Sequence, residues 1–106
     1  MKCKYSPEFD KLVIANNDDE LIQLSIDAAQ LAYKCKKAID HYHAFLKDRD
    51  FYRADYVAGN IHFVVSYLRG VVQDLFGMGF EHDFGAQARR AARESARDIL
   101  RFITSF

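Results

Sequence analysis

The sequence predicts an all-α domain, and three observations support this prediction. Apolar residues recur at alternating spacings of three and four through most of the chain, half of the 106 residues are apolar, and proline occurs once. An apolar repeat of this kind gives each helix one stripe that must be buried against other helices. A length of 106 residues corresponds to one domain. We therefore expect a single antiparallel helical bundle over residues 1–106, with one short and three long helices.

The short helix is predicted over about residues 7–16. Ser6-Pro7-Glu8 supplies a capping hydroxyl, a proline at the first helical position and an acid in the first turn. Apolar residues then share one face of this helix: Phe9, Leu12 and Val13. The polar pair Asn16-Asn17 is expected to end it.

The first long helix is predicted over about residues 19–47, with Asp18 as its N-cap. Its apolar residues follow four heptads without a break: Leu21, Leu24, Ala28, Leu31, Cys35, Ala38, Tyr42 and Phe45. Because Cys35 falls in this stripe, we expect it to behave as a small buried hydrophobe. The polar segment 47–50 is expected to form a tight turn into the next helix.

The second long helix is predicted over about residues 51–76, and it is apolar on nearly all sides. Such a composition predicts that this helix is the central one of the bundle. One flank of the helix is aromatic: Tyr52, Tyr56, Phe63 and Tyr67. We expect this flank to pack under the helix at about residues 7–16 or the one at about residues 86–105. If it is left bare, it becomes a candidate dimer interface.

Three glycines interrupt the helical periodicity between residues 77 and 85 and predict a loop. The last helix is then predicted over about residues 86–105. Its apolar side is small at the start and bulky at the end: Ala88, Ala92, Ala96, Ile99, Phe102, Ile103 and Phe106. The alanine-rich half is expected to lie close against the helix before it.

The charge balance argues against a general nucleic-acid coat protein, which would be strongly basic. Lysine plus arginine and aspartate plus glutamate each total 15, so the net charge is zero. The distribution is uneven, because acids dominate residues 8–27 and arginines dominate residues 85–106. No signal peptide or membrane-spanning stretch is recognisable, and the two cysteines make no disulfide framework. These features predict a cytoplasmic protein that does not enter a membrane.

Motifs that carry chemistry are not recognisable in the sequence. The pair His41-x-His43 cannot grip one metal ion from a helix, because residues two apart differ by about 200°. Gly77-x-Gly79 lacks the rest of a phosphate-binding loop. Helical HEPN-type ribonucleases carry an arginine followed four to six residues later by a histidine, and no arginine here has that partner. We therefore expect no enzyme, no metal site and no cofactor.

The best pointer to a binding surface is an arginine ladder, formed by Arg89, Arg93, Arg97 and Arg101. Spacing by four on a helix gives one stripe that rotates by about 40° per step. Arg90 lies beside it. An ordinary solvated face is the alternative, because Glu94 can pair with Arg90 and Arg97, and Asp98 with Arg101. Arg89 and Arg93 lie at the helix end where a cation is unfavourable, which favours a binding role.

The glycine-flanked loop is the second candidate, because Phe80 and Phe84 bracket three charged or titratable residues. An aromatic anchor with a charged rim is typical of a binding hot spot. The alternative is that the phenylalanines return to the core and the tip is simply hydrated. Loop and ladder adjoin in sequence, so one partner could cover both. The predicted partner-binding residues are Arg89, Arg90, Arg93, Arg97, Arg101, Phe80, Glu81, His82 and Asp83.

In size, one-domain helical build and lack of active-site motifs, the chain resembles the small helical inhibitors of bacteriophages and mobile elements, anti-CRISPR proteins among them. That resemblance implies steric blockade of a larger bacterial protein or nucleoprotein, such as a CRISPR effector. We accordingly expect a non-enzymatic protein-interaction module, either a monomer or a homodimer. Two alternatives stay open: a nucleic-acid-binding bundle that uses the arginine ladder, and a homo-oligomeric scaffold.

Overall fold

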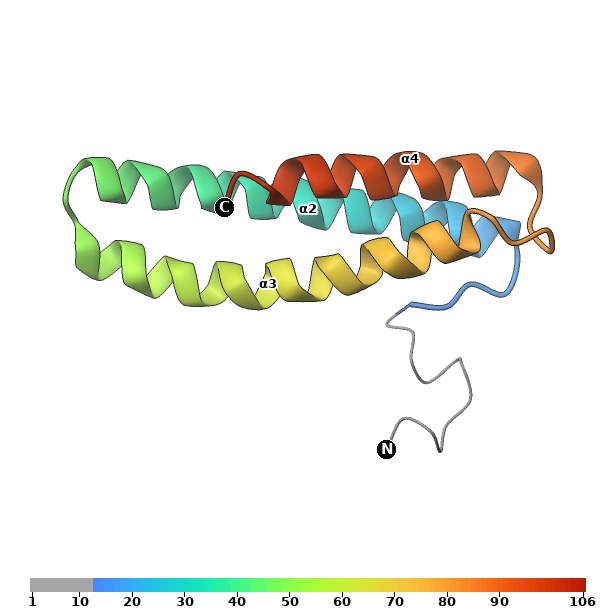
Figure 1. Cartoon of the computed structure of the whole chain (residues 1–106), viewed down its shortest axis with the longest axis horizontal. Coiled ribbons are helices and arrows are strands. Elements are labelled where there is room, and N and C mark those ends of the chain that lie inside the picture. The colour runs from blue at the N-terminus through green and yellow to red at the C-terminus, as the bar shows by residue number, and fades with distance from the viewer. Residues whose placement is uncertain (1–12) are drawn as a thin grey trace, which may run out of the picture.

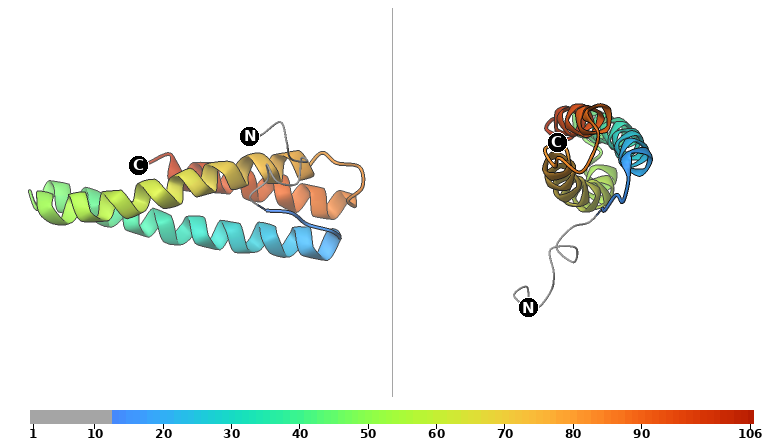
Figure 2. Two further views of the ribbon diagram at one scale, coloured as in Figure 1. Left: turned by 90° about the horizontal axis from the view of Figure 1, so that it is seen from below. Right: turned by 90° about the vertical axis from the view of Figure 1, so that its right-hand side faces the viewer.

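The computed structural model describes residues 13–106, and this range contains three α-helices and no strand. They are α2 (Asp18–Lys47), α3 (Phe51–Met78) and α4 (Ala86–Ile103). Figure 1 shows an up-down-up arrangement, in which α3 runs antiparallel to both α2 and α4. The end-on view of Figure 2 shows the three helices around a common axis. The all-α prediction and the bounds of the three long helices are therefore confirmed to within about two residues.

None of the helices between residues 13 and 106 has the length and apolar character that a membrane span requires. This finding concerns only the helices of that range.

The prediction of a fourth, short helix over residues 7–16 is wrong where it can be compared with the structure. Residues 13–17 are not helical, and residues 7–12 lie outside the described range. Side chains bind this stretch of backbone instead: the Val13 N–H donates to Asp74 Oδ2 at 3.1 Å, and the Asn16 N–H to Glu20 Oε1 at 2.9 Å. The N-cap of α2 is Asn17, not Asp18, because the Asn17 side chain accepts from the Glu20 N–H.

The turn between α2 and α3 forms as the polar segment 47–50 predicts. Arg49 takes a left-handed conformation with φ of 62°, which reverses the chain within three residues. The Asp50 side chain then caps α3 by accepting from the Arg53 N–H at 3.2 Å. The two long helices therefore form a tight antiparallel hairpin.

The core is built from one stripe of each helix. Its largest fully buried side chains are Leu21, Ile39, Ile61, Leu68, Leu75, Met78, Ile99 and Ile103. Ala88, Ala92 and Ala96 are also buried and bring the first half of α4 close to its neighbours. The buried position of Cys35, predicted from the heptad pattern, is confirmed.

Helix α3 is not central, which corrects the sequence-based prediction. Each helix contacts the other two, and α3 buries a single stripe as the others do. The side chains that made α3 look apolar on all sides are aromatic residues that face solvent: Tyr52, Tyr56 and Phe63 are 72–85% exposed. These aromatic residues stay exposed because α4, the third helix of the bundle, packs on a different side of α3.

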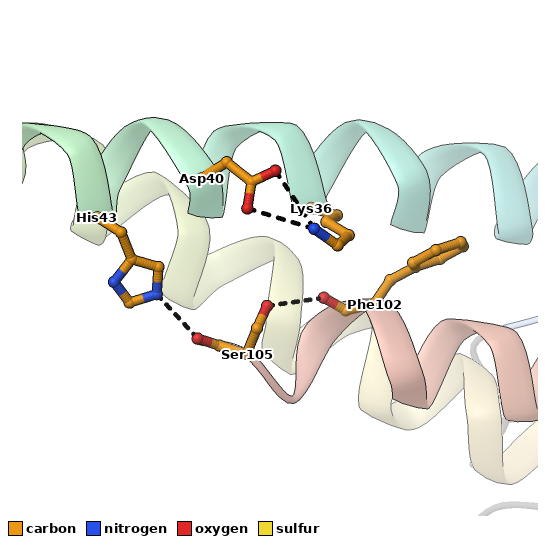
Figure 3. A network of polar contacts seen from close by, with 5 residues as sticks. All are labelled: Lys36, Asp40, His43, Phe102 and Ser105. Carbon is orange, nitrogen blue, oxygen red and sulfur yellow. Dashed lines mark hydrogen bonds and ion pairs between the residues drawn. The ribbon is translucent and has the colours of Figure 1, made fainter.

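Helix α4 is much shorter than the other two, with 18 residues against 30 in α2 and 28 in α3. The α2–α3 hairpin therefore extends beyond the end of α4 (Figure 1). The chain after Ile103 leaves the helix, and the Phe106 ring packs against His62 and Tyr42 at centroid distances of 4.6 and 5.3 Å. His43 Nε2 lies 2.9 Å from the Ser105 carbonyl oxygen, a contact that Figure 3 draws as a dashed line. These contacts fasten the C-terminal tail to the hairpin.

The close approach of α4 predicts that a larger side chain at Ala92 is destabilising. Ala92→Leu should lower the free energy of unfolding by about 1–3 kcal/mol, because the added atoms overpack a fully buried position. Urea denaturation followed by circular dichroism measures this change. Ala44→Leu, at an exposed position of α2, is the control and should alter stability by less than about 0.5 kcal/mol. Equal effects of the two substitutions would contradict the packing described here.

Candidate protein-binding surfaces

The loop between α3 and α4 holds one phenylalanine inside the protein and one outside. Phe84 is 7% exposed and joins the core, whereas Phe80 is 64% exposed. Backbone bonds shape the loop: the Gly79 N–H donates to the Leu75 carbonyl at 2.8 Å, and the Phe84 N–H to the Glu81 carbonyl at 3.2 Å. Of the two residues predicted to bracket a binding loop, Phe80 alone is available to a partner.

Arg93 fixes Phe80 in place. Its Nη1 donates to the Gly79 carbonyl oxygen at 2.6 Å, and its guanidinium carbon lies 5.2 Å from the centre of the Phe80 ring. That distance is within the range of a cation–π contact. Gly79 gives the arginine stem its space, because a Cβ at this position would lie 2.6 Å from Arg93 Cγ. The exposed ring is therefore held by a half-buried side chain of the neighbouring helix.

Arg89 also points to the loop. Its Nη1 lies 3.4 Å from His82 Nδ1, so this contact requires the histidine to present an unprotonated Nδ1. The Arg89 Nε atom is buried and has no hydrogen-bond partner among residues 13–106. These positions show that the first two steps of the arginine ladder face the protein and not only solvent.

The remaining arginines lie on the open side of α4, and they differ in whether a carboxylate pairs with them. Arg90 pairs with Glu94 at 3.0 Å and Arg101 with Asp98 at 2.8 Å, as the spacing predicts. Such exposed pairs contribute only about 0–1 kcal/mol to stability. Arg97 is exposed, and within the described range it makes no hydrogen bond or ion pair; its predicted contact with Glu94 does not form. Arg97 thus keeps its full hydrogen-bonding capacity for a partner.

A carboxylate explains how two cations are tolerated near the start of α4. Gly85, the N-cap of α4, has no side chain to cap the helix, and its N–H donates to Asp18 Oδ1 at 2.9 Å. Asp18 therefore places a negative charge beside the N-termini of both α2 and α4, where it is favourable. The position of Arg89 and Arg93, which the sequence alone suggested was functional, has a structural reason: they hold the loop.

A second surface lies on the outer side of α3. We call it the aromatic stripe, formed by Tyr52 (85% exposed), Tyr56 (72%), Phe63 (77%) and Tyr67 (41%). Helix α4 does not cover these rings, contrary to the sequence-based expectation; the other helix expected to cover them, at about residues 7–16, lies largely outside the described residues. Next to the stripe, a cavity of about 280 Å³ opens between α2 and α3, with Asn60, Val57 and Val64 of α3 in its wall. The sequence shows that the rings are spaced by four, seven and four residues, but it does not show that they are exposed.

The tip of the loop between α3 and α4 holds three more of the predicted partner-binding residues. His82 and Asp83 are exposed, and Glu81 is partly buried.

Between residues 13 and 106, no group of three or more histidine, cysteine, aspartate or glutamate side chains could hold a metal ion. Comparison of the chain with protein-family models, curated proteins and solved structures finds no match.

The contact between Gly79 and Arg93 predicts the effect of a single methyl group. Gly79→Ala should lower the free energy of unfolding by about 1–3 kcal/mol, because its Cβ would also lie 3.1 Å from the Leu75 carbonyl oxygen. Gly77→Ala is the matched control two residues earlier, where a Cβ meets nothing within 4 Å. It should stabilise α3 by up to about 1 kcal/mol. Chemical denaturation measures both, and equal shifts would rule out the proposed crowding.

Burial raises the pKa of the Cys35 thiol, which predicts slow reaction of the folded protein with a thiol reagent. The thiolate is the reactive form, so a raised pKa leaves less of it at a given pH, and reactivity increases as the pH rises toward that pKa. In a Cys3→Ser background, labelling by a disulfide reagent at pH 8 should be slow in buffer and fast in 6 M guanidinium. Fast labelling of the folded protein would contradict the buried position.

Proposed function

We propose that this chain is a protein-interaction module that binds a larger partner through the end of the bundle where α3 passes into α4. The contact surface consists of Phe80, the loop tip 81–83 and the open side of α4 at Arg90 and Arg97. The observation that carries the proposal is the state of Phe80, which is 64% exposed and yet fixed by Arg93.

A fixed exposed ring is favourable for binding on two counts. Its burial in a partner removes aromatic surface from water, which is the largest single contribution a side chain of this kind makes at an interface. Its conformation is restrained before binding, so less side-chain entropy is lost when the complex forms. Arg97, one turn beyond Arg93, adds a planar donor that suits a carboxylate of the partner.

The charges around Phe80 favour a protein partner over nucleic acid. Glu94 and Asp98 lie among the arginines of α4 and pair with two of them, while Arg89 and Arg93 are turned to the loop. A phosphate backbone needs several free cations, since each neutralised phosphate contributes about 0.9 to the slope of log K against log salt. An interleaved pattern of both signs is more suitable for a protein surface of mixed charge.

We further propose that binding acts by steric blockade, the role of the small helical inhibitors that the chain resembles in size and build. The partner class would be a larger bacterial protein or nucleoprotein, and a CRISPR effector is the example to test first. An assay of target-DNA cleavage by such an effector, with and without an excess of the chain, measures this role. Undiminished cleavage by the tested effectors would rule out blockade of these effectors. It would not bear on whether Phe80 and Arg97 bind another partner.

Truncation of Phe80 should disrupt partner binding with little effect on the fold. Phe80→Ala should weaken the complex by about 2 kcal/mol, roughly 30-fold, and Arg97→Glu should add to that loss. Pull-down from a bacterial lysate, with identification of the retained proteins and nucleic acids, finds the partner. Calorimetry with the purified partner then gives the affinities.

The control is Phe51→Ala, which removes a ring of similar exposure, 59%, at the opposite end of the bundle. It should leave the affinity unchanged. A partner that binds the Phe80 and Arg97 variants as well as the wild type would show that another surface is used. Retention of nucleic acid alone, lost steeply with salt, would favour the nucleic-acid-binding alternative.

A further inference from the structure

We propose that the aromatic stripe of α3 is a homodimer interface, in which two copies of α3 pack antiparallel across Gly59 and Asn60. This inference goes beyond the proposed function, because it assigns a different surface and a different partner. Three features of the stripe carry it: its symmetry, the glycine at its centre and the lack of charge along it.

The positions of the rings are symmetric about one point of the helix. Tyr52 and Tyr67 are equally far from the Gly59–Asn60 bond, and so are Tyr56 and Phe63. In an interface with twofold symmetry, if a residue i of one copy contacts a residue j of the other, then residue j of the first copy contacts residue i of the second. Two antiparallel α3 helices that cross at this bond would therefore pair Tyr52 with Tyr67 and Tyr56 with Phe63.

Among the described residues, no close contact requires a glycine at position 59. Glycine is among the least favourable residues in a helix interior, and its φ here is ordinary for a helix. A Cβ at Gly59 would meet nothing within 4 Å, so no neighbour in the monomer requires its absence. The distance between two packed helices depends on the side chains at their contact. A glycine at the crossing point lets the two backbones approach and brings the flanking rings into contact.

The stripe has the composition and the area of an interface core. Residues 56–67 contain no aspartate, glutamate, lysine or arginine, so a second copy would bury no charge there. At the exposures given above, the four rings present roughly 400–700 Å² of surface, since each aromatic side chain contributes about 150–250 Å² when buried. A standard interface buries about 800 Å² on each partner. The four rings alone therefore supply half or more of such an interface, and the apolar wall of the α2–α3 cavity, which Asn60 links to the stripe, adds to it.

Within residues 13–106, no helix or loop covers this face of α3, so a second copy can reach it. Helix α4 packs on a different side of α3, and the Phe106 tail contacts His62, which is about 100° around the helix from Phe63. The exposed Phe80 lies beyond the end of α3 and outside the residues that the dimer would cover. Dimerisation and the proposed partner binding can therefore be separated by mutation.

The test is the mass of the full-length chain in solution, measured by light scattering after size exclusion and by sedimentation over a range of concentrations. The wild type should approach twice the chain mass of 12.3 kDa as the concentration rises. Phe63→Asp should be monomeric throughout, with an unchanged helical circular dichroism spectrum, because Phe63 is 77% exposed in the monomer. Phe80→Ala should dimerise like the wild type, which distinguishes this interface from the proposed partner surface.

A matched glycine pair tests the crossing point without a change of charge. Gly59→Gln and Gly77→Gln both place a good helix former at a position on α3 that is open in the monomer, so both should raise the thermal midpoint at low concentration. Only Gly59→Gln should weaken self-association, by tenfold or more. If the wild type is monomeric at every concentration, or if Gly59→Gln dimerises as well as Gly77→Gln, the proposal is overturned and the stripe belongs to a different occupant.

Discussion

Much of the structure depends on how closely α4 can lie against the α2–α3 hairpin. Ala88, Ala92 and Ala96 are buried along one side of α4, so only methyl groups separate its backbone from the neighbouring helices. At this distance the stem of Arg93 packs on Gly79, and the amide of Gly85 reaches the carboxylate of Asp18. The conformation of the loop between α3 and α4, and with it the position of Phe80, therefore follows from small side chains elsewhere.

The shortness of α4 determines which apolar surface remains uncovered. A bundle of three helices buries about one side of each, and here the third helix ends well before the turn between the other two. The C-terminal tail covers part of that gap through Phe106, but Phe106 contacts His62, about 100° around α3 from Phe63, and the Phe63 ring stays exposed. The aromatic residues of α3 stay exposed because no element between residues 13 and 106 is long enough, or placed, to cover them.

Local patterns in the sequence were sufficient for the three long helices and insufficient for the surfaces. The heptad spacing from Leu21 onward and the glycines around residue 79 predicted where helices begin and end, because both signals act within a few residues. The pairing of Arg90 with Glu94 was predictable for the same reason. The contact of Arg93 with Gly79 depends on how two helices meet, and the exposure of Tyr56 depends on which face α4 takes. Periodicity alone gave Tyr56 and Val57 the same apolar character, although Tyr56 is exposed and Val57 is partly buried.

The length of α3 has a consequence for geometry. A helix of 28 residues is a stiff rod, and the Gly59–Asn60 bond lies about 20 residues before Phe80. At about 1.5 Å per residue, two chains joined antiparallel at that bond would present their Phe80 rings on the order of 60 Å apart. A pair of sites held at a fixed separation engages two targets at once only if those targets match the spacing. The dimer would then hold its two Phe80 sites at a fixed separation. Bivalent binding, more than the affinity of one Phe80 site, would determine which assemblies the protein binds.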